Sequence, residues 1–115
     1  MDHLAKPPIA SGELEPWWGR IALFAGLEHV ACKVSGLITE ADWSSWTPAD
    51  LQPFVDHAIE VFGPRRLVFG SNWPVCLVAA TYAEVLSTAR TTLGGLTDSE
   101  QAAVMGTNAT RIYGL

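Results

Sequence analysis

Apolar residues along the chain follow two spacings, one typical of amphipathic helices and one typical of buried strands. Helical spacing, in which apolar positions recur every three or four residues, runs through several segments that end at glycine or proline. Two short segments between them are rich in β-forming residues and are predicted to be strands. The expected order is a helix over 17–27, a strand over 29–35, a loop over 37–46, a helix over 47–62, a strand over 66–70, a helix over 82–93, a helix over 97–105 that stops at Gly106, and a last helix over 108–113.

The second strand, residues 66–70, lacks polar alternation, as expected of a strand covered on both faces of a parallel sheet. Strand, helix and strand make one βαβ unit, but two or three parallel strands seldom form a stable sheet by themselves. A closed barrel of eight such units takes about 250 residues, and this chain has 115. The sequence therefore predicts one segment, 1–115, of an incomplete α/β sheet that associates with another chain or with itself. A small stand-alone α/β module is the less supported alternative.

Composition and charge narrow the classes of function. Acidic residues outnumber basic ones by 12 to 7, which gives a net charge of −5, and the basic residues form no cluster, so nucleic-acid binding is not expected. No segment is long and apolar enough to enter a membrane, and the first residues do not resemble a secretion signal, so we expect a cytoplasmic protein. Cys32 and Cys76 lie far apart in the sequence and are interpreted as reduced, small hydrophobic residues.

The working residues of parallel α/β folds lie just beyond the carboxyl ends of strands, which selects three candidate places in this chain. They are Asp2–His3 at the start, Lys33–Gly36 after the first strand and Ser71–Pro74 after the second. If the strands are parallel neighbours, all three places lie together at the carboxyl ends of the strands, an edge that we call the rim. His29 precedes a strand and His57 lies beside a helical apolar stripe, so both are assigned to the surface or to packing.

The same three places carry a family resemblance. The segments DHLAKPP at 2–8, CKVSGLITEADW at 32–43 and FGPRRLVFGSNWPVC at 62–76 resemble amidohydrolase family 2 and, within it, the fuconolactone-hydrolase-like sugar lactonases. The resemblance extends to the final NATRIYGL at 108–115 and so covers nearly the whole chain. It implies the C-terminal part of a (β/α)₈ TIM barrel, comprising the end of the sixth strand and the seventh and eighth βα units. The H-x-H motif of the family's first strand has no counterpart here.

His3 and Asn72 are the candidate catalytic residues that this resemblance implies. The family places a histidine after its fifth or sixth strand and an acid after its eighth, around a water or a metal ion. The family pattern Gly-Ser-Asp-Trp-Pro matches Gly70–Pro74, with Asn72 in place of the acid. A carboxylate would take a proton from the attacking water and return it to the leaving group. The Asn72 amide can orient water but cannot accept that proton, and an asparagine that only caps the turn is the alternative.

Four more residues are candidate substrate contacts. Lys33 and Ser35 alternate with apolar neighbours and would point into a barrel towards a carboxylate or hydroxyl group, although a lysine there can also reach solvent. Glu40 follows them and either substitutes for the absent acid or is a solvated loop residue. Trp73 either lines a site for a sugar-like ring or packs at the barrel mouth.

The resemblance implies that a small-molecule lactone or amide, such as a sugar lactone, is opened by activated water. His3 would donate to the substrate carbonyl or bind a metal, and a full-length relative would hold one divalent metal such as zinc, although some lactonase members work without one. The remaining ligands are absent from this chain, for which no cofactor is expected. A catalytically inactive remnant, or a subunit that only associates with another chain, is the alternative. We expect no hydrolysis by the isolated chain, because too few rim residues are present to position water and substrate.

Overall fold

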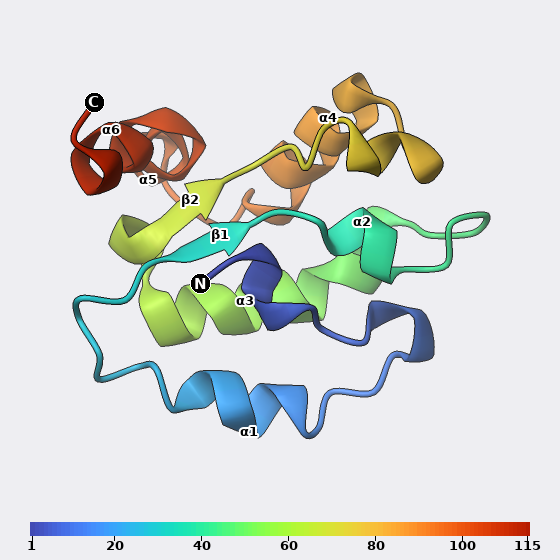
Figure 1. Ribbon diagram of the computed structural model, residues 1–115, viewed down its shortest axis with the longest axis horizontal. Coiled ribbons are helices and arrows are strands. Elements are labelled where there is room, and N and C mark those ends of the chain that lie inside the picture. The colour runs from blue at the N-terminus through green and yellow to red at the C-terminus, as the bar shows by residue number, and fades with distance from the viewer.

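Two short parallel strands, β1 (Cys32–Val34) and β2 (Leu67–Phe69), form the centre of the computed structural model, which describes all residues 1–115. Cys32 lies opposite Leu67 and Val34 opposite Phe69 in the pair. The helix α3 connects the strands and covers one face of the pair, and the later helices lie on the other side of β2 (Figure 1). The helices are α1 (Trp17–Ala22), α2 (Leu37–Glu40), α3 (Pro48–Phe62), α4 (Tyr82–Thr92), α5 (Asp98–Ala102) and α6 (Asn108–Tyr113).

The first residues of the chain extend the sheet on the outer side of β1. The amino nitrogen of Met1 donates to the carbonyl oxygen of Ala31 at 2.7 Å, and the carbonyl oxygen of Met1 accepts from the Lys33 N–H at 2.9 Å. Hydrogen bonds from one residue to two residues on either side of its neighbour are the pattern of a parallel strand pair. On the free side of β2, the Asn108 side chain donates to the carbonyl oxygen of Leu67 at 2.8 Å. A backbone group at the sheet edge is thus satisfied by a helix rather than by another strand.

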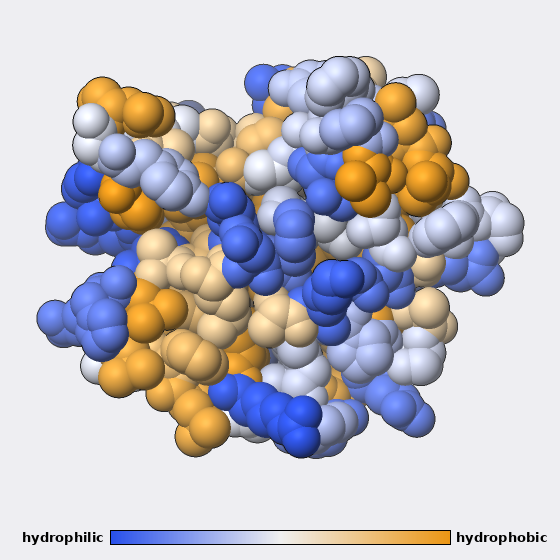
Figure 2. All heavy atoms as spheres, viewed as in Figure 1, coloured by the Kyte–Doolittle hydropathy of each residue, from blue (hydrophilic) through white to orange (hydrophobic).

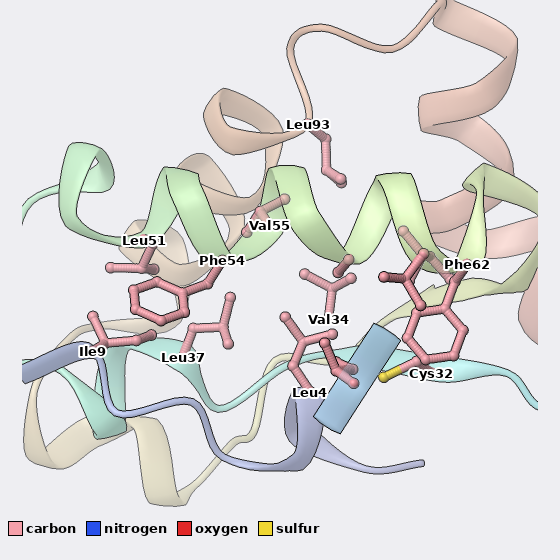
Figure 3. Packing of buried hydrophobic residues seen from close by; sticks show 14 of the residues in the cluster. Leu4, Ile9, Cys32, Val34, Leu37, Leu51, Phe54, Val55, Phe62 and Leu93 are labelled. Carbon is pink, nitrogen blue, oxygen red and sulfur yellow. The ribbon is translucent and has the colours of Figure 1, made fainter. Parts of the chain in front are cut away.

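The apolar core lies between α3 and the strands. Thr47 and Asp50 form a capping box at the start of α3, and Pro48 occupies its first turn, so the helix begins where the sequence predicts. Its inner face carries Phe54 and Phe62, which point towards β1 and the N-terminal segment (Figure 3). Each large buried side chain contributes about 1.5–3 kcal/mol. This packing fixes the orientation of the helix and hence of the strand ends that flank it.

Arg66, directly before β2, holds the segment that connects α1 to β1. Its guanidinium group and Nε donate to backbone carbonyl oxygens at distances from 2.8 to 3.3 Å. The six acceptors belong to Phe24, Ala25, Leu27, Val30, Val61 and Phe62. Because these carbonyl groups come from two separate parts of the chain, Arg66 replaces regular secondary structure as the link between them.

The predicted elements occur in the expected order, but several differ in extent. The first helix ends at Ala22 rather than at residue 27, and both strands are three residues long. The prediction of a loop over 37–46 is wrong for its first four residues, which form α2. Gly36 allows this early start, because its φ of 67° turns the chain directly into the helix.

The prediction that Gly106 stops a helix is also wrong. A π-helical segment, Ala103–Thr107, joins α5 to α6 without a break. A glycine ends a helix when it adopts a positive φ. Gly114 does so, with a φ of 67°, and follows the end of α6, whereas Gly106 is not among the residues with positive φ.

Apolar side chains remain exposed on parts of the surface. Figure 2 shows them gathered at the upper right, over the segment that precedes α4, where Val75, Leu77 and Val78 are each more than half exposed. No helix combines the length and the apolar character needed to cross a membrane. The expectation that another chain covers such surface stays a prediction.

Candidate functional site

A left-handed turn carries His3 away from the extended first residues. The consecutive residues His3–Lys6 have φ angles from 47° to 56°. Each non-glycine residue in this region costs roughly 1–2 kcal/mol, so the surrounding structure must hold the turn. Leu4 is fully buried and its carbonyl oxygen accepts from Trp17 Nε1 at 2.7 Å, while Lys6 Nζ lies 3.8 Å from a carboxylate oxygen of Glu40. Strain of this kind, fixed by packing, is typical of functional sites.

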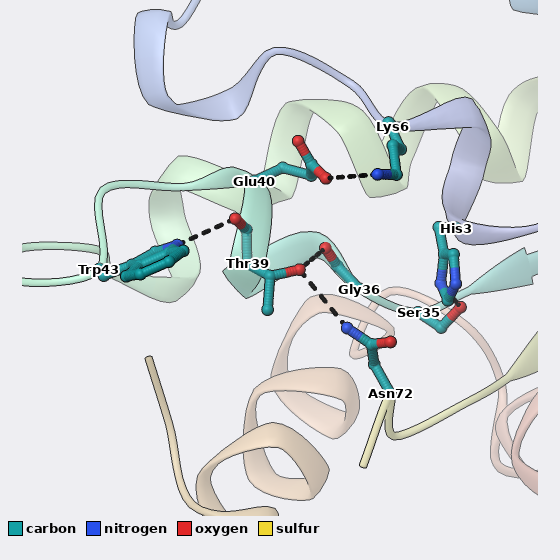
Figure 4. A network of polar contacts seen from close by, with 8 residues as sticks. All are labelled: His3, Lys6, Ser35, Gly36, Thr39, Glu40, Trp43 and Asn72. Carbon is teal, nitrogen blue, oxygen red and sulfur yellow. Dashed lines mark hydrogen bonds and ion pairs between the residues drawn. The ribbon is translucent and has the colours of Figure 1, made fainter. Parts of the chain in front are cut away.

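The His3 ring is fixed by the residue that follows β1. Its Nδ1 lies 2.8 Å from Ser35 Oγ, and Ser35 is 5% exposed (Figure 4). Ser35 therefore acts on His3 rather than presenting a free hydroxyl group to a substrate. The second ring nitrogen, Nε2, makes no hydrogen bond within the chain and remains available.

Gly36 lies between His3 and Asn72. A Cβ atom added at Gly36 would lie 2.9 Å from His3 Nδ1 and 3.4 Å from Asn72 Nδ2. Both side chains therefore approach the same point, and a larger residue would push His3 away. The positive φ of Gly36 adds a second reason for glycine at this position. The two catalytic candidates predicted from the sequence thus converge across one glycine.

The Asn72 amide is oriented by Thr39. Thr39 Oγ1 donates to the carbonyl oxygen of Gly36 at 2.7 Å, so its oxygen is free to accept from Asn72 Nδ2 at 3.4 Å. This arrangement places the Asn72 Nδ2 towards α2 and leaves Oδ1 as an acceptor for water (Figure 4). Sequence reasoning missed Thr39. Its position three residues after Gly36, in the first turn of a helix that the sequence did not predict, is the signal that could have found it.

The other candidate contacts do not join the His3–Asn72 group. Lys33 Nζ lies 3.0 Å from Asp2 Oδ1 and 5.7 Å from the centre of the Tyr113 ring. The hydrogen bond to Lys33 holds the pKa of Asp2 below its usual value, and the same contact raises the pKa of Lys33. Glu40 pairs with Lys6, as described above, and Trp73 is 63% exposed.

The residues assigned to packing or to the surface lie where the sequence predicts. His57 is 4% exposed, stacks on Trp18 with ring centres 3.6 Å apart, and has its Nε2 3.0 Å from the Trp18 carbonyl oxygen. His29 is exposed. Cys32 and Cys76 are free and buried, and burial raises the pKa of the Cys32 thiol to about 11. Both cysteines are thus buried without a disulfide bond.

The residues of this chain do not form a metal site by themselves. A catalytic zinc ion takes three protein ligands and keeps one open position. No group of three or more His, Cys, Asp or Glu side chains in the chain could hold a metal ion. His3 Nε2 and Asn72 Oδ1 are the available donors at the rim, so no step of the chemistry is assigned to a metal here.

Fold and site together define the class of protein. Parallel strands alternate with helices, and the polar side chains gather where the strands end, as in enzymes built on α/β barrels. The chain belongs to the amidohydrolase family, whose model matches residues 1–115. Its two strands do not close a barrel, and the chain corresponds to the C-terminal part of an amidohydrolase barrel.

Two curated relatives of the chain are lactonases. It is 42% identical over 125 residues to the L-fucono-1,5-lactonase of Burkholderia multivorans, an alignment that covers 100% of this chain and 42% of that protein. It is 41% identical over 87 residues to the L-fucono-1,5-lactonase of Burkholderia ambifaria, covering 73% of this chain and 29% of that protein. The chain thus spans less than half the length of these relatives.

Solved structures agree with this assignment. A crystal structure of an amidohydrolase from Burkholderia multivorans with bound HEPES superposes with a TM-score of 0.91 at 42% identity, covering 100% of this chain and 44% of that one. A second crystal form of an amidohydrolase from that organism, with bound zinc, gives a TM-score of 0.89 at 43% identity, covering 99% of this chain and 43% of that one. A full-length relative therefore does hold a divalent metal.

Proposed function

We propose that this chain supplies the C-terminal rim of a lactone hydrolase that acts on a sugar-lactone-like substrate such as L-fucono-1,5-lactone. The observation that carries the proposal is the approach of His3 and Asn72 to one point beside Gly36. Both side chains are held by hydroxyl groups, those of Ser35 and Thr39, so their polar atoms are positioned before a substrate arrives. The lactonase relatives supply the substrate class.

In the proposed reaction, Asn72 Oδ1 accepts a hydrogen bond from the attacking water. The water oxygen forms a bond to the lactone carbonyl carbon, and His3 stabilises the negative charge that develops on the carbonyl oxygen. The ring C–O bond then breaks, and the ring oxygen takes up a proton to give the hydroxy acid. Because an amide cannot accept the proton of the water, that proton passes to a base outside this pair, and the base returns it to the ring oxygen.

The proposal assigns different roles to Trp73 and Lys33. Trp73, which follows Asn72 and is largely exposed, offers a flat apolar face to a sugar-like ring. Lys33 is engaged by Asp2 and would meet a substrate carboxylate only by giving up that ion pair. Glu40 is engaged by Lys6 in the same way, so we assign neither of these ion-paired residues to the reacting group.

A second candidate function is association without catalysis. Asn72 stands where the family pattern has an acid, and the chain spans 42% of its Burkholderia multivorans relative. Under this alternative the chain pairs with another chain and contributes structure but no reacting group.

The proposal is tested by supplying the part of the barrel that this chain lacks, taken from the Burkholderia multivorans relative, and measuring hydrolysis of L-fucono-1,5-lactone. We expect His3→Ala to lower kcat/KM by about 10²-fold, the order of magnitude lost with one positioned donor. His29→Ala is the matched control, because His29 is exposed and precedes β1 rather than following it, and it should leave the rate unchanged. Equal rates for the two variants would support association without catalysis.

A further inference from the structure

We infer that Ser35 is a positioning residue that sets the tautomer of His3, so that the protonated Nε2 faces the rim as a hydrogen-bond donor. The inference deepens the proposed function and rests on it for its catalytic consequence. It concerns a single contact, in which His3 Nδ1 and Ser35 Oγ lie 2.8 Å apart. The hydrogen in that contact belongs either to the Ser35 hydroxyl group or to His3 Nδ1, and the surroundings of Ser35 distinguish the two arrangements.

In the first arrangement the Ser35 hydroxyl group donates to an unprotonated His3 Nδ1. The hydroxyl hydrogen is then satisfied, and the ring proton is on Nε2. In the second arrangement a protonated Nδ1 donates to Ser35 Oγ, and the hydroxyl hydrogen needs another acceptor. Ser35 is 5% exposed, and His3 is the partner of its hydroxyl group within the chain. A buried donor without an acceptor is unfavourable, so the first arrangement is preferred.

A small cavity beside Ser35 bears on the second arrangement. It has a volume of about 30 Å³, enough for a water molecule, and is lined by Ser35, Gly36, Thr39 and Asn72 together with apolar side chains. The second arrangement requires a water in this cavity to accept the hydroxyl hydrogen. The first arrangement requires no such water and uses only the atoms whose contact is already in place.

The left-handed turn makes the tautomer matter for function. The backbone turn at His3–Lys6 brings the ring beside Gly36, and the contact with Ser35 Oγ holds its Nδ1. Nε2 is therefore the nitrogen presented at the rim, and in the first arrangement it carries a proton. A neutral imidazole of this kind donates to a carbonyl oxygen and stabilises the oxyanion, but it neither takes a proton from water nor binds a metal.

The experiment is a long-range ¹H–¹⁵N spectrum of the 115-residue chain at about pH 8.5, where imidazole groups are neutral. The His3 ring signals are assigned by their loss in His3→Gln. We expect the shift of a protonated nitrogen at Nε2 and that of an unprotonated, hydrogen-bonded nitrogen at Nδ1. The reverse pattern, with the proton on Nδ1, would overturn the inference and would place a water in the cavity.

Two variants test whether Ser35 positions the His3 ring or only contributes to the stability of the fold. Ser35→Ala removes the donor, so we expect the Nδ1 signal to shift and the two ¹⁵N shifts to move towards each other as the second tautomer becomes populated. Ser71→Ala, on the neighbouring rim segment, is the matched control and should leave both shifts in place. An unchanged spectrum in Ser35→Ala would overturn the role of Ser35.

The His57 ring reports on folding in each variant, because its stacking on Trp18 shifts its signals. If Ser35→Ala loses those shifted signals, the variant is unfolded. The position of the ring proton in the unsubstituted chain then tests the inference by itself. The tautomer is measured without turnover. The expected tautomer combined with no hydrolysis by a completed barrel would overturn the proposed function and leave the positioning role of Ser35 intact.

Discussion

Asn72 shows most clearly how one residue limits the chemistry of the whole site. The resemblance to the family implies a catalytic acid at its position after β2, and Thr39 orients its amide so that the oxygen is available for water. The site can therefore hold a nucleophile but lacks a proton acceptor at the place where one is expected.

We predict that Asn72→Asp increases lactone hydrolysis by a completed barrel. The carboxylate would accept the proton of the attacking water, and general-base catalysis contributes about 10²–10⁴-fold. Thr39 Oγ1 would have to turn from the Gly36 carbonyl oxygen to donate to the new carboxylate. The measurement is kcat/KM against pH, which should rise as the carboxyl group ionises. Asn72→Ala, with neither group, is the control and should lower the rate. A rate for Asn72→Asp at or below that of the parent contradicts the prediction.

The sequence suggested the candidate reacting residues but not the residues that hold them. His3 and Asn72 were identified because each follows a strand and matches a family motif. Thr39 and Gly36 were not assigned roles, because their importance depends on distances across the rim. Ser35 was predicted to contact a substrate, whereas its hydroxyl group lies against His3. That contact requires the left-handed turn, and no sequence pattern predicts four non-glycine residues in that conformation.

At the scale of elements, the regular helices were predicted well and the irregular connections were not. The capping signals of α3 and α5 fixed their starts, because a side chain three residues from the cap satisfies exposed backbone groups locally. The segment between α1 and β1 has no such local pattern. Its carbonyl groups are satisfied by Arg66, which is distant in the sequence.

We predict that Arg66→Lys destabilises the chain by about 2–4 kcal/mol, because a lysine cannot reproduce the planar set of donors that binds several carbonyl groups. The measurement is the free energy of unfolding from urea titration. Arg65→Lys is the matched control, because Arg65 is exposed and its side chain makes no hydrogen bond, and it should change stability by less than about 0.5 kcal/mol. Similar losses in both variants would show that the Arg66 hydrogen bonds do not stabilise the connection.

The stability of the start of α4 should depend on pH. Glu84 accepts from the Thr81 N–H at 2.7 Å and from its hydroxyl group at 2.8 Å, and these bonds lower the pKa of Glu84 from 4.5. A lowered pKa stabilises the folded state fully above the unfolded value of 4.5, and this contribution is lost as the pH falls through the folded value.

We therefore predict that Glu84→Gln lowers the Tm at about pH 7, and that the difference from the parent is smaller at about pH 3, because the parent carboxyl group takes up protons as the pH falls. Thermal unfolding at the two pH values measures this. Glu13→Gln is the control, because the Glu13 side chain is exposed and makes no hydrogen bond or ion pair. A difference for Glu84→Gln that stays constant between the two pH values contradicts the assignment.

At the scale of the whole molecule, the chain presents the candidate site at the ends of two parallel strands. Met1 continues the parallel order beside β1, and the Asn108 side chain occupies part of the opposite edge. The sequence predicted this incomplete sheet from the number of strands and the chain length. It could not predict that a helix side chain satisfies an edge carbonyl group, because that contact joins residues 41 positions apart.

The central claim is that this chain supplies the C-terminal rim of a lactonase and requires the remainder of a barrel to act. The most direct measurement is hydrolysis of L-fucono-1,5-lactone by the chain alone, by the complementary N-terminal part of the Burkholderia multivorans relative alone, and by the two together. We predict turnover by the combination, no turnover by either part, and a kcat/KM that is about 10²-fold lower for the combination with His3→Ala. Turnover by the isolated chain, or a folded combination that hydrolyses no lactone, would contradict the claim.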